Sequence, residues 1–185
     1  SENAAVLEQT QAQKNGAFPK EISRCEELAK NPQALKAETP TVLRDTLTLL
    51  AQLEYHAGWV DEPVTRLREA LAVPGVRGDT APLIARLSTA LTRRGLERLP
   101  SVTTPKNPAL ADLEEALKLR PTPAGRHALA LGLLSAGEPK AAVEQLRGLV
   151  EAGPGGGSED PRVLAAYGRA LRESGRAADS VPVLF

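Results

Sequence analysis

The sequence predicts an all-α fold, a solenoid built from antiparallel helix pairs. Apolar residues recur at helical intervals along most of the chain, and a glycine-containing turn interrupts this pattern four times. The hydrophobic fraction is 42%, but aromatic residues make up only 3%, so leucine, alanine and valine must form the core at close helix separations. At 185 residues the chain is long enough to bury such a core without disulfides.

The glycine turn defines a repeat, because each time it follows an apolar helix. It occurs at Ala57-Gly58, Arg94-Gly95, Ala136-Gly137 and Ser174-Gly175, so the glycines lie 37, 42 and 38 residues apart. A second periodic run follows the first three turns and stops near a proline. We therefore expect one repeat domain over residues 40–185, with units at about 44–78, 81–121, 126–154 and 161–185, the last one incomplete.

Inside these units, small and large apolar residues fall at positions that resemble the tetratricopeptide repeat (TPR) family. The third unit shows the fullest set, which consists of Leu129-Ala130, Leu133, Gly137, Ala142, Leu146, Leu149 and Pro154. The other two matching sets are Tyr167-Gly168, Leu171 and Gly175 in the fourth unit, and Leu50-Ala51, Gly58, Leu67 and Ala70 in the first. The resemblance covers about four degenerate repeats and implies a right-handed TPR-like superhelix.

Three segments depart from the repeat. Residues 1–39 fit it poorly and are expected to form an N-terminal helical segment, a candidate cap, with helices at 4–14 and 19–30. Residues 96–108 contain three prolines and are expected to form a loop. Residues 153–158 are glycine-rich; no Lys-Ser or Lys-Thr follows them, so they predict a flexible connector rather than a phosphate-binding loop.

Catalytic and metal-binding patterns are absent from the sequence. His56 and His127 lie in different units and lack a metal-ligand partner three or four residues away. Cys25 is the single cysteine, which excludes an intramolecular disulfide and a thiolate metal site. We therefore expect no enzyme activity, no catalytic residue, no metal and no cofactor.

Charge and hydropathy argue against two further partner classes. Lys plus Arg and Asp plus Glu both number 23, and few aromatic residues could stack on bases, so nucleic acid is not expected. No apolar run approaches the ~18 residues that span a bilayer, so membrane insertion is not expected. The protein is therefore expected to be soluble. The sequence contains no methionine, so Ser1 is not a translation start and we expect a leader or another removed segment upstream; the compartment, cytoplasmic or periplasmic, stays open. Helical repeats of the bacterial type need no disulfides in either compartment.

The TPR resemblance implies a partner-binding surface, because in that family the first helix of each pair lines the concave face where peptides lie. Carried over to this sequence, these positions are Gln52, Tyr55, His56, Arg86, Thr89, Arg93, Leu131, Leu134, Ser135, Arg162, Arg169 and Arg172. Such a surface suits a peptide with acidic residues around an apolar anchor, since guanidinium groups make forked hydrogen bonds to carboxylates. The expected function is a protein- or peptide-binding scaffold.

Two alternatives stay open at this point. The chain could be a structural or self-assembling segment of a larger TPR protein, because an apolar end consisting of Val181, Val183, Leu184 and Phe185 could pack on another copy. Trp59, directly after the first turn, is expected either between the helices of the first unit or exposed at a contact surface.

Overall fold

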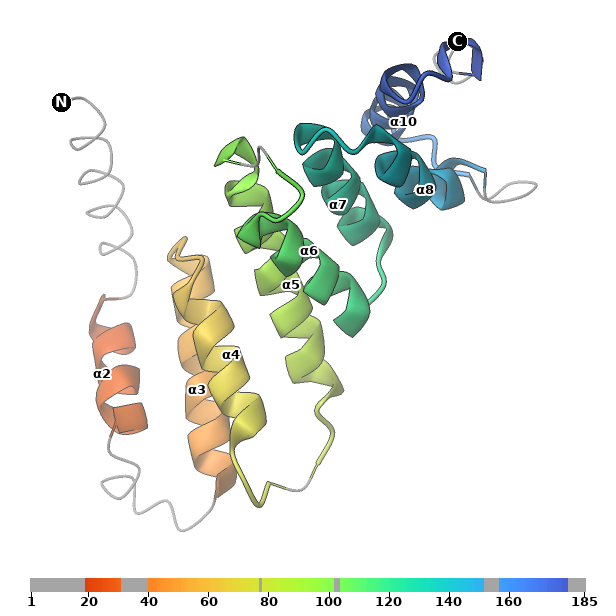
Figure 1. Ribbon diagram of the computed structural model, residues 1–185. Helices are drawn as coiled ribbons and strands as arrows, with labels where there is room; N and C mark the ends of the chain where they lie inside the picture. The colour runs from red at the N-terminus through yellow and green to blue at the C-terminus, as the bar shows by residue number, and fades with distance from the viewer. Residues whose placement is uncertain (1–18, 31–39, 77, 102–103, 152–156, 180–185) are drawn as a thin grey trace, which may run out of the picture. The chain divides into compact units, whose positions relative to one another are not determined.

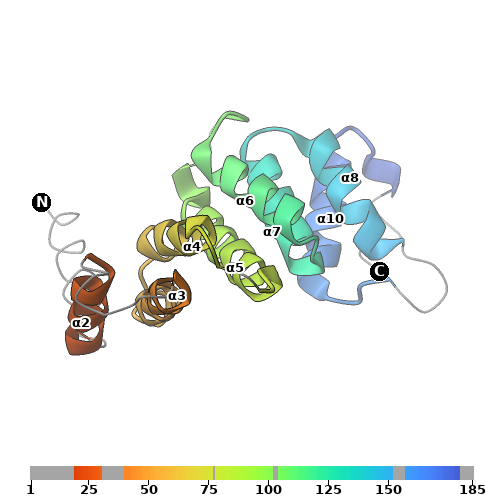
Figure 2. The ribbon, with the colours of Figure 1, turned by 90° about the horizontal axis from the view of Figure 1, so that it is seen from below.

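The computed structural model describes residues 19–30, 40–76, 78–101, 104–151 and 157–179 (Figures 1 and 2). All regular structure in these ranges is helical, which confirms the predicted all-α class. The elements are α2 (Pro19–Lys30), α3 (Pro40–His56), α4 (Glu62–Ala72), α5 (Ala81–Glu97), η1 (Leu99–Ser101), α6 (Pro108–Leu119), α7 (Pro123–Ser135), α8 (Pro139–Val150) and α10 (Pro161–Glu173). The chain divides into two compact units, a first unit up to Ala90 and a second unit from Leu91.

In the first unit, α3 and α4 form a tightly packed antiparallel pair, and α2 packs on α3 (Figure 1). Leu47 of α3, Ala70 of α4 and Leu83 of α5 are buried together, so the next helix along the chain closes over this pair. A second cluster joins α2 to α3 and includes Trp59 at its edge. Trp59 is half-buried in this cluster of α2 and α3 residues, so it is neither between the two helices of the first repeat nor fully exposed.

In the second unit, α6 packs on α7, α7 on α8, and α8 on α10, while α10 also touches α7 (Figure 2). The first helices of the third and fourth repeats are therefore neighbours, as in stacked helix pairs. Their shared core contains Ala130, Leu134, Ala142, Val143, Leu146, Val163, Ala166, Tyr167, Ala170 and Leu171. The Tyr167 hydroxyl also donates a hydrogen bond to Glu151 Oε1 at 2.7 Å, which ties α10 to the end of α8.

Three of the four predicted glycine turns are confirmed, and they share one hydrogen-bond pattern. Gly58, Gly137 and Gly175 have φ values of 90°, 75° and 84°, a left-handed conformation that costs glycine little. The residue that follows each glycine donates its backbone N–H to the carbonyl oxygen of the residue five positions earlier, at N···O distances of 3.0, 2.8 and 2.8 Å. These are Schellman motifs, which satisfy carbonyl groups at the helix end and turn the chain into the following helix.

The predicted turn at Arg94-Gly95 was wrong. α5 continues through both residues to Glu97, and Gly95 is buried inside the helix. The loop predicted for residues 96–108 is correspondingly shorter, because η1 follows α5 closely and α6 begins at Pro108. Gly95 has a packing role instead, since a Cβ atom there would lie 2.6 Å from Leu113 Cγ on α6.

Proline and side-chain caps fix where the helices of the second unit begin. Proline opens α6, α7, α8 and α10, at a position whose N–H would have no partner within the helix. In front of three of these helices, Asn107, Thr122 and Asp160 accept hydrogen bonds from nearby backbone N–H groups at 2.9, 3.0 and 2.8 Å. The helix starts are therefore encoded locally.

Some predicted features lie outside the described residues. These are the helix at 4–14, most of the glycine-rich connector and the apolar end at 181–185. The helix predicted for residues 19–30 is confirmed as α2. In the described part of the chain, none of the helices combines the length and apolar character that crossing a bilayer requires.

Candidate partner-binding surface

In the first unit, the predicted surface residues of α3 and α5 lie side by side. His56, Arg86 and Thr89 are exposed, while Gln52 and Tyr55 are half-buried. The side-chain amide of Gln52 on α3 is in contact with the guanidinium group of Arg86 on α5. This contact joins first helices of successive pairs, so their outward faces form one continuous surface here.

Two apolar side chains on this surface were missed by the sequence analysis. Val42 and Leu49 are 41% and 49% exposed, and Leu49 stands one helical turn before Gln52 on α3. Apolar residues seven apart on the otherwise polar side of a helix were the available signal. They add exposed apolar side chains on α3 of the first unit to the predicted Leu131 of the second unit.

In the second unit, the exposed side of α10 is strongly basic. Arg162, Arg169 and Arg172 are all exposed and lie within a narrow stripe, with the small residue Ala165 between them. Arg169 Nε pairs with Glu173 Oε1 at 2.7 Å, whereas Arg162 and Arg172 form no ion pair with any residue that the structure describes. Their guanidinium groups are therefore available to an external carboxylate.

The neighbouring helix α7 contributes less than the sequence predicted. Leu131 is half-buried and Ser135 is exposed, but Leu134 is only 4% exposed and belongs to the core shared with α10. Leu134 is therefore not accessible to a partner. Arg93 on α5 is half-buried and is paired with Glu97 at 3.2 Å.

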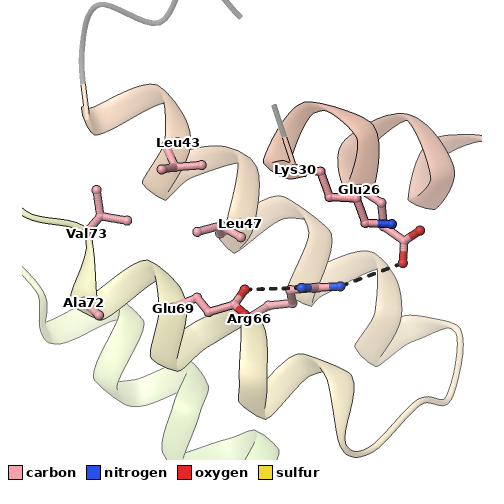
Figure 3. A pocket seen from close by; sticks show the side chains of 8 residues that line it. All are labelled: Glu26, Lys30, Leu43, Leu47, Arg66, Glu69, Ala72 and Val73. Atoms are coloured by element: carbon pink, nitrogen blue, oxygen red, sulfur yellow. Dashed lines mark hydrogen bonds and ion pairs between the residues drawn. The ribbon is translucent and has the colours of Figure 1, made fainter. Parts of the chain in front are cut away.

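A cleft that the sequence analysis did not predict lies between α2, α3 and α4, with a volume of ≈ 430 Å³ (Figure 3). Apolar and charged side chains both line it: Leu43, Leu47, Ala72 and Val73 on one hand, and Glu26, Lys30, Arg66 and Glu69 on the other. Figure 3 shows Arg66 between Glu69 of its own helix and Glu26 of α2, at 3.2 and 3.8 Å. The cleft forms only because α2 packs beside α3 and α4, and a sequence pattern within one helix cannot predict such packing.

Glu54 of α3 contacts Arg66, which lines this cleft, and is completely buried. Its Oε1 is 3.5 Å from Arg66 Nε, while its Oε2 has no hydrogen-bond partner. Burial raises the pKa of the Glu54 carboxyl from 4.5 to about 7, although the Arg66 guanidinium opposes this rise. The group therefore titrates near neutral pH, in contrast to an exposed glutamate.

Candidate metal ligands are the next feature of the described ranges. No group of three His, Cys, Asp or Glu side chains gathers there in a way that could hold a metal ion. Cys25 is buried against α3 rather than placed in a cleft. What the geometry offers is a set of exposed helix faces that combine arginines with apolar side chains.

Comparison with known proteins bears on the fold. No family model and no curated protein sequence matches this chain. The crystal structure of the MamA protein, a TPR protein, is similar to it with a TM-score of 0.52 and 17% sequence identity, over 95% of this chain and 88% of that one. At this identity the likeness concerns the fold. Together with the helix pairs and the three glycine turns, it shows that this chain has the TPR fold.

Proposed function

We propose that this protein is a scaffold that binds an acidic peptide or protein segment through the outward faces of its first helices. The observation that carries the proposal is the stripe of Arg162, Arg169 and Arg172 on α10, all exposed beside α7 and its half-buried Leu131. Exposed arginines suit the carboxylates of a partner, because a guanidinium group makes forked, charge-assisted hydrogen bonds to them.

The physical basis is the combination of charge and apolar contact. Arginine presents a planar fork of N–H donors, so two neighbouring arginines can orient an extended acidic chain along the helix. Leu131 offers an apolar contact next to that chain, and Ala165 leaves room for it to approach the helix closely. A scaffold of this kind needs neither catalytic residues nor a cofactor.

The test is charge reversal at the stripe, R169E/R172E, measured as binding to an array of peptides that combine acidic residues with one apolar residue. We expect captured peptides to bind at least about tenfold more weakly, since each charge-assisted hydrogen bond contributes roughly 1.5–3 kcal/mol. Capture from a lysate of the source organism, with mass spectrometry, then identifies the natural partner.

A matched control uses two exposed basic residues elsewhere in the same unit. K118E/R126E changes the net charge by the same amount but leaves α10 intact. It should retain binding within about twofold, because the arginine stripe on α10 is unchanged, whereas a loss caused by overall charge alone would be the same in both variants. Equal loss in both variants, or no loss in R169E/R172E, would show that this face does not bind the partner.

A further inference from the structure

α2 packs on α3 within the first unit. Among the α2 side chains that the structure describes, Ile22 and Cys25 are buried, and they pack on Leu50 and Ala57 of α3 with Leu53 and Trp59 at the edge. An apolar face of α3 therefore lies under α2.

An ionic cluster joins the helices α2, α3 and α4. Arg66 of α4 reaches Glu54 of α3 at 3.5 Å, Glu26 of α2 at 3.8 Å and Glu69 of its own helix at 3.2 Å. One cation thus faces three carboxyl groups. Glu54 is the one among them that is fully removed from water.

The charge state of Glu54 is set by groups from each helix around it. Burial opposes its ionisation most strongly, Arg66 favours ionisation, and Glu62 of α4 and Glu26 of α2 oppose it further. Its pKa is about 7, and its Oε2 has no partner, so an ionised Glu54 is poorly compensated when α2 is in place. If α2 leaves, water reaches the cluster and the ionised form is stabilised.

We propose that α2 is a pH-controlled cover: protonated Glu54 keeps it on α3, and ionisation of Glu54 releases it and uncovers the apolar face around Leu50 and Trp59. This device does not depend on the proposed peptide-binding function. It gives the protein a conformational response between mildly acidic and neutral pH.

The direction follows from proton binding. With α2 in place Glu54 holds its proton up to about pH 7, whereas a solvated glutamate loses it near pH 4.5. The covered form therefore binds more protons between these values, so raising the pH favours release, by up to roughly tenfold per pH unit. Above about pH 7 both forms are ionised, and the effect levels off.

The chain provides a probe at the right place. Cys25 is the single cysteine, and it lies on the side of α2 that is buried against α3, so its reaction with 4,4′-dithiodipyridine should become faster when this helix is released. We define protection as the labelling rate of the urea-unfolded chain divided by that of the native chain at the same pH, which cancels thiol ionisation. From pH 5 to pH 7.5 we expect protection to fall at least fivefold in the unaltered protein.

Two variants separate Glu54 from other groups. E54Q cannot ionise and should keep protection constant within about twofold over this range. D45N changes an exposed carboxyl group of α3 that is not among the groups acting on Glu54, so it should follow the unaltered protein. Should E54Q lose helical circular dichroism, Glu54→Leu replaces it as the non-titrating variant. A flat profile in the unaltered protein, or a fall of equal size without a carboxyl at position 54, overturns the proposal.

The urea dependence of the labelling rate distinguishes local release of α2 from global unfolding. Labelling through release of α2 exposes little surface, so its rate should be nearly independent of urea below the main transition. The emission of Trp59, the single tryptophan, should move to longer wavelength over the same pH range, because it loses its contact with α2. A labelling rate that rises steeply with dilute urea would show global unfolding and overturn the proposal.

Discussion

Replacing Asp112 by alanine is expected to lower the free energy of unfolding by about 3–5 kcal/mol. Asp112 is 6% exposed on α6, and both of its carboxylate oxygens are bound by Arg94 of α5, at 2.6 and 2.8 Å. Arg98 Nη1 adds a contact at 3.4 Å. D112A therefore leaves the guanidinium of Arg94, whose side chain is only 12% exposed, as a buried charge without its carboxylate.

Urea unfolding followed by circular dichroism measures this loss. Glu114→Ala is the matched control, because Glu114 is exposed on the same helix and its removal should change stability by about 0.5 kcal/mol or less. The double substitution R94M/D112L should recover much of the stability, since apolar side chains often replace a buried ion pair without loss. A cost below about 1 kcal/mol for D112A would mean that the pair is not buried in solution.

The helices themselves could be predicted because their signals are local. Helical periodicity, prolines at helix starts and glycines at helix ends lie within a few residues of one another, and they gave α2, the helix pairs and the turns at Gly58, Gly137 and Gly175. Gly95 also follows an apolar helical run, but it lies inside α5 and packs against α6 instead of ending the helix. Leu87, Leu91 and Gly95 continue the apolar stripe at intervals of four, which is the feature that indicates a continuous helix.

The candidate surface could be predicted only in part. Exposure of the arginines on α10 follows from the helix period, but burial of Leu134 depends on α10 packing against α7. The interactions of Glu54 and Asp112 are likewise invisible in the sequence, because their partners lie 12 and 18 residues away on other helices. Whether a polar residue on the core side of a helix is paired is a tertiary property. Binding at the predicted positions remains a prediction.

Gly95→Ala is expected to destabilise the protein by about 1–3 kcal/mol, although alanine is normally the better helix former by about 1 kcal/mol. The reason is the close approach of α5 and α6. An added Cβ would lie 2.6 and 2.8 Å from Leu113 Cγ and Cδ2, and 3.0 Å from the backbone oxygen of Ala109. Since a branching carbon and a backbone atom cannot move aside like the tip of a flexible side chain, the two helices must separate.

Gly148→Ala provides the opposite case within the same unit. Gly148 is exposed on α8, and an added Cβ would meet nothing within 4 Å, so this change should stabilise the protein by about 0.5–1 kcal/mol. The two substitutions are chemically identical, and urea unfolding should give opposite signs for them. If G95A were as stable as G148A, α5 and α6 would not be in contact at Gly95, and the continuous helix through Arg94 and Gly95 would lose its packing rationale.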